Sequence, residues 1–205
     1  MSGKFILIEG GDGAGKDTHI ARLKELLKDR PTVFTREPGG TRIGKVLREM
    51  LLHESEGPVS LPAELFLFMA DRAQHVEEVI KPALAAGKIV VSNRSWISFL
   101  AYQIQGREQY DWGSLMRMGI EKVYADAPVD LALVLDVPVE VGRERQKAMG
   151  KSYDTMESMS TETRERIRQA FLNLARTLPQ AVVIDANRPV EQVWEDVKYQ
   201  VLRVI

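Results

Sequence analysis

The chain of 205 residues contains no cysteine and only three histidines. The lack of cysteine excludes disulfide bonds and metal sites built on thiolates, and it is compatible with a reducing compartment. His19, His53 and His75 are scattered along the chain and show no metal-ligand spacing. We therefore expect a cytoplasmic protein without a metal bound by histidine or cysteine.

The sequence also lacks an apolar run near the ~18 residues that a membrane-spanning helix needs. Residues 1–4 lead directly into a predicted strand, so we expect no signal peptide. The formal net charge is −1, from 28 basic and 29 acidic residues. Because no overall field draws such a protein to a polyanion, we expect neither nucleic acid nor a membrane as a partner.

What the chain does contain is enough apolar material, 44% of its residues, for one full core. The length suits a single domain over 1–205. Short apolar runs predict strands and amphipathic stretches predict helices. The predicted strands are 5–9, 32–35, 89–92, 131–136 and 181–184. The predicted helices are 18–27, 43–52, 61–86, 96–105, 114–125, one that starts at Pro138, 161–177 and 189–205. This alternation favours an α/β fold with three layers, in which helices cover both faces of a five-stranded parallel sheet.

Single residues add detail to two of these helices. Pro82 has no backbone N–H and is expected to kink or interrupt the helix over 61–86. Ser114 is a residue type that caps helices, so we expect it at the start of the helix over 114–125. Residues 149–158 are polar and are expected to be irregular.

A glycine-rich stretch between the first predicted strand and the first predicted helix carries the clearest chemical signal. Its spacing, G-x-x-x-x-G-K, is that of a phosphate-binding loop. Glycines allow successive backbone N–H groups to point at an anion, and the helix that follows adds the positive end of its dipole. Lys16 supplies a mobile full charge for the outer phosphates. The predicted phosphate-binding residues are Gly10, Gly11, Asp12, Gly13, Ala14, Gly15, Lys16, Asp17 and Thr18.

Other polar motifs follow strands, and in parallel sheets ligands bind beyond the carboxyl ends of the strands. Arg36 follows the second predicted strand, and Asn93 and Arg94 follow the third. A guanidinium group is planar and always charged, which suits it to a second phosphate. The alternative for Arg36 and for Arg94 is a surface ion pair.

Together these motifs make the chain resemble the thymidylate kinases, which are nucleoside monophosphate kinases that phosphorylate dTMP. The resemblance is carried by residues 9–16, 35–41, 68–76 and 94–103, in the family's order and at about its spacing. It implies the P-loop kinase fold, ATP as phosphoryl donor with Mg²⁺, and a homodimer. The implied reaction transfers the γ-phosphate of ATP to dTMP and gives dTDP.

The resemblance also implies roles around the acceptor nucleotide. Phe68 would stack on the pyrimidine, and Arg72, on the same helical face, would donate to a base carbonyl. Asp12 would accept a hydrogen bond from the sugar 3′-OH, Tyr102 would crowd the 2′ position, and Gln103 would reach the base. The structural alternatives are a place in the core for Phe68, a turn for Asp12 and half-buried packing for Tyr102.

For the transfer itself, we expect Lys16 and the loop amides to hold the donor phosphates and Arg94 to bridge donor and acceptor. Residues 143–158 would close over the site as a mobile lid that expels water. Arg145 is our candidate for the charge that meets the transferred phosphoryl group. The alternative for Arg145 is a place on a solvated basic helix face.

Three positions depart from the family pattern. Asp17 replaces the hydroxyl residue after the loop lysine, and Asn93 stands where the family usually has the Asp that helps hold Mg²⁺. Thr155 replaces the arginine of the lid pattern D-R-x-E. Because a carboxylate is lost at 93 and gained at 17, we hypothesise that Asp17 supports the metal. The alternative is an acid that merely favours the helix dipole.

Phe99 occupies a position near the base that is usually small or polar in the family. A kinase for another deoxynucleoside monophosphate therefore remains an alternative. The changes at Asp17, Asn93 and Thr155 also leave open a nucleotide-binding protein that has lost turnover.

Overall fold

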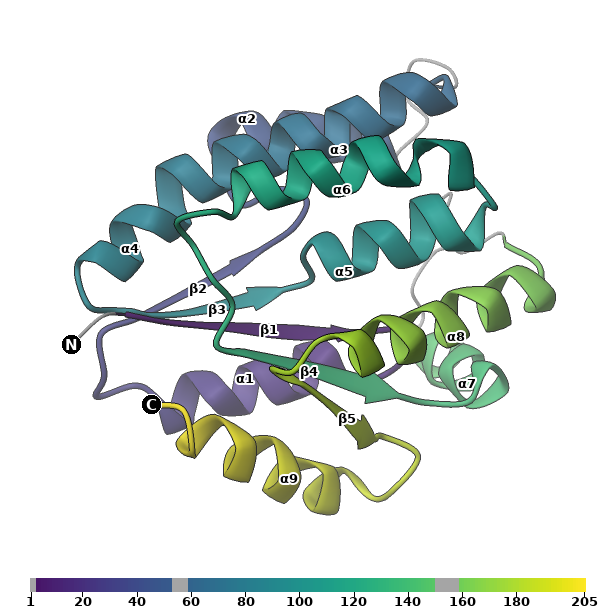
Figure 1. Ribbon diagram of the computed structural model, residues 1–205. Coiled ribbons are helices and arrows are strands. Elements are labelled where there is room, and N and C mark those ends of the chain that lie inside the picture. Colours follow the sequence, from purple (N-terminus) through teal and green to yellow (C-terminus); the bar gives the residue numbers. More distant parts are fainter. Residues whose placement is uncertain (1–2, 53–58, 150–158) are drawn as a thin grey trace.

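The structure is a computed structural model that describes residues 3–52, 59–149 and 159–205. Five parallel strands form one sheet in the order β2-β3-β1-β4-β5 (Figure 1). The strands are β1 Lys4–Gly10, β2 Thr32–Arg36, β3 Ile89–Asn93, β4 Leu131–Asp136 and β5 Ala181–Asp185. The predicted strands and their parallel arrangement are therefore confirmed.

Helices cover both faces of this sheet, which confirms the three layers. They are α1 Lys16–Leu26, α2 Arg42–Leu52, α3 Leu61–His75, η1 Val76–Ile80, α4 Lys81–Ala85, α5 Trp96–Phe99, η2 Leu100–Gly106, α6 Tyr110–Val123, α7 Val139–Ala148, α8 Thr161–Thr177 and α9 Val190–Leu202. Helices α1 and α9 lie below the sheet in Figure 1, whereas α3, α5, α6 and α8 lie above it. Each face has its own hydrophobic core.

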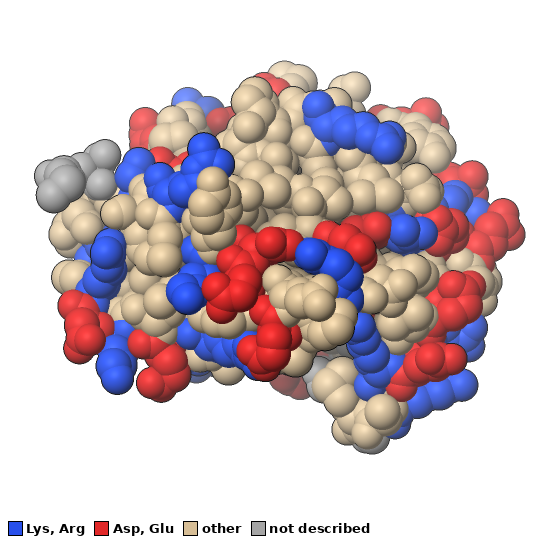
Figure 2. Space-filling view, turned by 90° about the horizontal axis from the view of Figure 1, so that it is seen from below, with Lys and Arg blue, Asp and Glu red and all other residues tan. Residues whose placement is uncertain are grey.

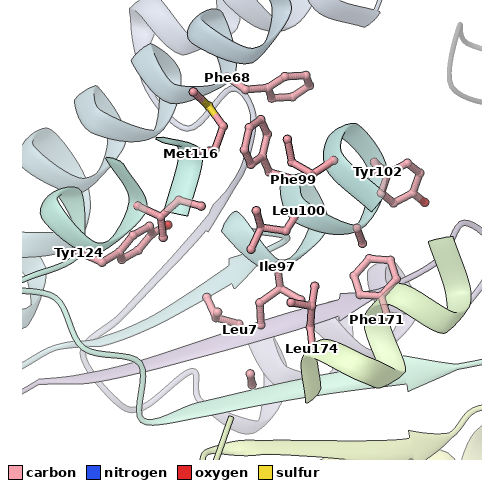
Figure 3. Close-up of a cluster of buried hydrophobic side chains, with 14 of the residues drawn as sticks. Leu7, Phe68, Ile97, Phe99, Leu100, Tyr102, Met116, Tyr124, Phe171 and Leu174 are labelled. Carbon is pink, nitrogen blue, oxygen red and sulfur yellow. The ribbon is translucent and has the colours of Figure 1, made fainter. Parts of the chain in front are cut away.

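The alternation of side chains along β1 divides these two cores. Phe5 and Leu7 belong to the core under α5, α6 and α8, part of which Figure 3 shows. Ile6 and Ile8 point the other way, into the core under α1 and α9. All four side chains are fully buried. A strand buried on both faces is expected to be a continuous apolar run, which is how this strand was recognised.

The helix boundaries correct one detail of the prediction and specify another. Ser114 is not a cap, because α6 begins at Tyr110 and contains Ser114 in its interior. Asp111 in the first turn favours this earlier start through the helix dipole. The expected interruption near Pro82 takes the form of the π-helical segment η1, which separates α3 from α4 just before the proline. The wider π turn precedes the proline and accommodates its missing backbone donor.

The outer face over α1 and α9 carries acidic and basic side chains side by side, as Figure 2 shows. Arg22 forms an ion pair with Glu191 at 2.5 Å, and Arg188 forms one with Asp196. Within the described ranges, no helix is both long enough and apolar enough to cross a bilayer.

The register of the sheet places the carboxyl ends of its strands along one edge. Arg36 of β2 is aligned with Asn93 of β3, and Ile8 of β1 is aligned with the same Asn93. Gly10 is aligned with Leu135 of β4. The glycine-rich loop, Arg36 and Arg94 therefore leave neighbouring strands at the same edge.

Candidate active site

The glycine-rich loop joins β1 to α1 and requires its glycines. Gly10, Gly13 and Gly15 have φ angles of 132°, 77° and 90°, which L side chains rarely adopt. A Cβ atom at Gly10 would lie 2.3 Å from the carbonyl oxygen of Leu135, and one at Gly13 would lie 2.2 Å from that of Gly142. The loop is thus packed against β4 and α7, which hold its curved path.

Lys16 begins α1 and folds back over this loop. Its Nζ donates to the carbonyl oxygens of Gly10, at 2.9 Å, and Gly11, at 2.7 Å. Burial, together with the positive charge of Arg94, lowers the pKa of Lys16 to about 7. Asp12 and other nearby carboxylates oppose this shift. An anion in the loop would stabilise the charged form of Lys16.

Arg94 lies directly beside Lys16. Its backbone has a φ of 70°, and its N–H donates to Ile8 at 3.0 Å. The guanidinium Nη1 donates to the carbonyl oxygen of Gly10, at 3.2 Å, and to the hydroxyl of Ser98, at 3.1 Å. The cations Lys16 and Arg94 therefore converge on the same carbonyl, that of Gly10.

Asp12 and Tyr102 complete this cluster. The Asp12 carboxylate accepts from Nη2 of Arg94 and, at 2.9 Å, from the hydroxyl of Tyr102. Burial raises the pKa of Asp12, but the charges of Arg94 and Lys16 outweigh it and bring the pKa below its usual value. A pocket opens next to this pair and is lined by residues of β4 and α8, including Arg164 and Arg168. A sugar hydroxyl entering here would meet an ionised acceptor.

The residues predicted around the base are more deeply buried than the sequence suggested. Phe68 is 6% exposed, and its ring centroid lies 5.8 Å from that of Phe99, as Figure 3 illustrates. Arg72 is 2% exposed, with its Cζ 4.9 Å from the Phe99 ring and its Nε 3.0 Å from Glu37 Oε2. Gln103 is buried and donates to Glu64 at 3.4 Å. Phe99 thus contacts both Phe68 and the guanidinium of Arg72.

A buried polar network behind Arg72 was missed by the sequence reasoning. Glu37 accepts from Arg72 and from the Tyr124 hydroxyl, at 2.8 Å, and contacts His75 Nδ1 at 3.0 Å. Burial raises the pKa of Glu37, but the charge of Arg72, with smaller contributions from His75 and Tyr124, lowers it overall. The sequence shows Glu37 in a predicted turn and His75 in a predicted apolar helix. Neither position indicates which residue the side chain would contact.

Two predicted residues lie at the rim of the site. Arg36 ends β2 and is exposed next to the Asn93–Arg94 segment. Arg145 lies on α7, where it donates to the carbonyl oxygens of Gly13, at 3.5 Å, and Ala186, at 3.1 Å. The part of the predicted lid over 150–158, which includes Thr155, lies outside the described residues.

Two of the three positions that depart from the implied family pattern, Asp17 and Asn93, are in contact with each other. Asn93 Nδ2 donates to Asp17 Oδ1 at 2.8 Å. The other amide atom, Asn93 Oδ1, is buried and has no hydrogen-bond partner among the described residues. The same part of the chain contains no group of three or more His, Asp or Glu side chains that could hold a metal.

A family model, curated relatives and a solved structure were compared with this chain, and all point to the same family. Residues 8–197 match the family model described as "Thymidylate kinase". The thymidylate kinase of Carboxydothermus hydrogenoformans is 44% identical over 197 residues, covering 95% of each chain. That of Pelotomaculum thermopropionicum is 44% identical over 200 residues, covering 96% of this chain and 92% of its own. The crystal structure of the Ehrlichia chaffeensis thymidylate kinase superposes with a TM-score of 0.76 at 31% identity and covers 99% of both chains. A chain matched over nearly its whole length in this way belongs to the thymidylate kinase family.

Proposed function

We propose that this protein transfers the γ-phosphoryl group of ATP to dTMP and releases dTDP. Members of its family are nucleoside monophosphate kinases. The observation that carries the proposal is the convergence of Lys16 and Arg94 on the Gly10 carbonyl, at 2.9 and 3.2 Å. One cation belongs to the phosphate loop and the other to the neighbouring strand end. Two phosphates bound by these cations would therefore meet.

Phosphoryl transfer needs positioning and charge neutralisation more than covalent chemistry. The donor phosphates would bind the loop amides, from Gly10 to Thr18, and Lys16. Phosphate oxygens would replace the loop carbonyls that Lys16 and Arg94 now contact. Arg94 would then bridge the two nucleotides, with Arg36 on the acceptor phosphate and Arg145 on the transferred group.

The acceptor nucleoside would lie between Asp12 and the base site. Asp12 would accept from the 3′-OH, and Tyr102, already bound to Asp12 at 2.9 Å, would restrict the 2′ position. Phe68, Arg72 and Gln103 would contact the base. Because all three are buried, their use requires these side chains to become accessible when the nucleotide binds. We further propose that 1–205 form one domain, that 143–158 close as a lid and that the protein is cytoplasmic.

The residues present also fit Mg²⁺. Mg²⁺ usually takes one or two protein oxygens together with waters and substrate phosphates. Asp17 supplies a carboxylate at the start of α1, and the unpartnered Asn93 Oδ1 lies on the side chain bonded to it. We propose that these two side chains hold the ion. When bound, it would neutralise charge on the donor phosphates.

The activity can be tested by supplying γ-labelled ATP and Mg²⁺ with each of several nucleoside monophosphates. We expect dTMP to be phosphorylated at least about tenfold faster than dCMP, dAMP, dGMP or UMP, because a buried polar site rejects unmatched bases. Phe99, which fills space beside Phe68 and Arg72, favours a second candidate, a kinase with another deoxynucleotide acceptor. Product from another deoxynucleotide alone would support that candidate. ATP binding with no product would contradict both.

Binding of ATP at pH 8 is expected to take up close to one proton. Lys16, with a pKa of about 7, is mostly neutral at that pH, and bound phosphates would return its pKa toward the usual value. The affinity should therefore fall as the pH rises above 7. Calorimetry in two buffers with different ionisation enthalpies measures the uptake. The Lys16→Arg variant, which is always protonated, should show none. Equal binding enthalpies in both buffers for the unmodified protein would contradict the expectation.

We also propose a homodimer formed through α2, α3 and α6, which pack side by side. Each carries an exposed apolar side chain, namely Val46, Phe66 and Met118, and Met118 is 66% exposed. Substituting Met118→Glu would bury a charge in such an interface and is expected to give a monomer in analytical ultracentrifugation. The exposed Val183 lies on β5, outside this surface, so Val183→Glu is the matched control. A monomeric unmodified protein, or a Met118→Glu dimer, would contradict the proposal.

A further inference from the structure

Glu9 is a buried carboxylate that none of the roles above uses. It follows Phe5 and Leu7 on the same face of β1 and is fully buried immediately before the glycine-rich loop. A carboxylate in such a place is costly unless it is paired or well hydrogen-bonded. Burial raises the pKa of Glu9, and the bonds from two serines and the charges of Arg94 and Lys16 oppose the rise.

Two serine hydroxyls at the start of α5 contact this carboxylate. Ser95 Oγ donates to Glu9 Oε1 at 2.6 Å, and Ser98 Oγ donates to Oε2 at 2.5 Å. A hydroxyl has one hydrogen, and each serine donates that hydrogen to Glu9. Each serine oxygen can therefore only accept further hydrogen bonds, through its lone pairs. Ser98 Oγ thereby accepts from Arg94 Nη1 at 3.1 Å, and Ser95 Oγ accepts from the backbone N–H of Ile97 at 3.4 Å.

We propose that Glu9 is a positioning residue that orients the guanidinium of Arg94 through the hydroxyl of Ser98. This inference rests on the proposed function, in which Arg94 bridges the two nucleotides. Arg94 needs such support because its φ of 70° is sparsely populated for a residue with a side chain. Arg94 donates a hydrogen bond to Ser98, and Ser98 donates one to Glu9. Because the Glu9 carboxylate can only accept, it fixes the direction of both hydrogen bonds.

An amide at position 9 would disturb this direction. Glutamine keeps the shape of glutamate but donates through its –NH₂ group. A serine that accepts from this group must turn its own hydrogen away from position 9. With the –NH₂ group in place of Oε2, the oxygen that Ser98 contacts, the Ser98 hydrogen would point toward the N–H groups of Arg94, which are also donors. Glu9→Gln is therefore expected to misplace Arg94 while leaving Lys16 and the loop in place.

The experiment compares Glu9→Gln, Ser98→Ala and the double variant, with Ser95→Ala as the matched control. Each single change is expected to lower kcat for dTMP about tenfold, the effect of losing one hydrogen bond to a charged group. The KM for ATP should stay within about twofold. The double variant should lose no more than about tenfold, because both changes interrupt the same connection. Ser95→Ala should lower the Tm and leave kcat within about twofold.

A second readout needs no turnover. In NMR spectra of the ligand-free protein, the Arg94 side-chain N–H signal should shift in Glu9→Gln and in Ser98→Ala, but not in Ser95→Ala. Multiplying effects in the double variant, about a hundredfold, would overturn the inference, as would a lower Tm with unchanged kcat and unchanged Arg94 signal. If Glu9→Gln does not fold, Ser98→Ala carries the test. An unmodified protein that phosphorylates no nucleotide refutes the proposed function instead, and the NMR comparison still decides the role of Glu9.

Discussion

Replacing Lys16 with methionine is expected to lower kcat for phosphoryl transfer about 1,000-fold or more. Methionine keeps most of the length of the side chain and removes the charge that lies 2.9 and 2.7 Å from the loop carbonyls of Gly10 and Gly11. That charge is buried, and burial together with Arg94 lowers its pKa to about 7. Its removal should therefore leave the Tm unchanged or raise it.

The measurement is kcat at saturating ATP and dTMP, together with a thermal unfolding curve. Lys28→Met, at an exposed position near the end of α1, is the matched control and should behave like the unmodified protein. A Lys16→Met variant that is stable and retains more than about a tenth of the activity would remove Lys16 from the mechanism.

Replacing Asp17 with alanine is expected to abolish Mg²⁺-dependent turnover, with a loss of at least about a hundredfold. Asp17 supplies the carboxylate of the proposed metal site, and Asn93, bonded to it at 2.8 Å, has no charge to substitute for it. Kinetics over a range of Mg²⁺ concentrations should show that high Mg²⁺ restores little of the rate. Asp29→Ala, which removes an exposed acid away from the site, is the control for the loss of one negative charge and should keep normal Mg²⁺-dependent turnover.

A double exchange separates a metal ligand from an acid that only favours the helix dipole. Asp17→Ser with Asn93→Asp places a hydroxyl at position 17 and a carboxylate at position 93, the arrangement that the resemblance described in the sequence analysis implies. This variant should regain most of the turnover that Asp17→Ala loses, since the site keeps one carboxylate. Near-normal activity in Asp17→Ala, or no recovery in the double variant, would contradict the assignment.

The sequence was sufficient to predict the layers and strands of the fold because each strand is a short apolar run between amphipathic helices. Its errors were local. Ser114 looked like a cap because serine favours that position, but the helix starts at Tyr110, where the acid Asp111 in the first turn is a weaker signal than a cap residue. The interruption expected near Pro82 is present, but its form, a π-helical segment before the proline, depends on packing that a sequence pattern does not reveal.

Asp12, Arg94 and Tyr102 come into contact because the glycine-rich loop and the Arg94 segment leave neighbouring parallel strands at one edge, a proximity that the parallel sheet predicted from the sequence favours. The link between Glu9 and Ser98 could not be predicted in the same way. It joins residues 89 positions apart through a register that is known only once the sheet has formed. The burial of Phe68 against Phe99 likewise depends on how α3 packs on α5.

The most direct test of the account is a crystal structure with a bisubstrate analogue, adenosine and thymidine joined through a chain of phosphates, in the presence of Mg²⁺. The account predicts that the adenosine-side phosphates lie on the loop amides and Lys16, that the thymidine-side phosphate contacts Arg94 and Arg36, and that the metal lies beside Asp17. A complex in which Arg94 and Arg36 point away from the phosphate chain, or in which thymidine binds elsewhere, would contradict it.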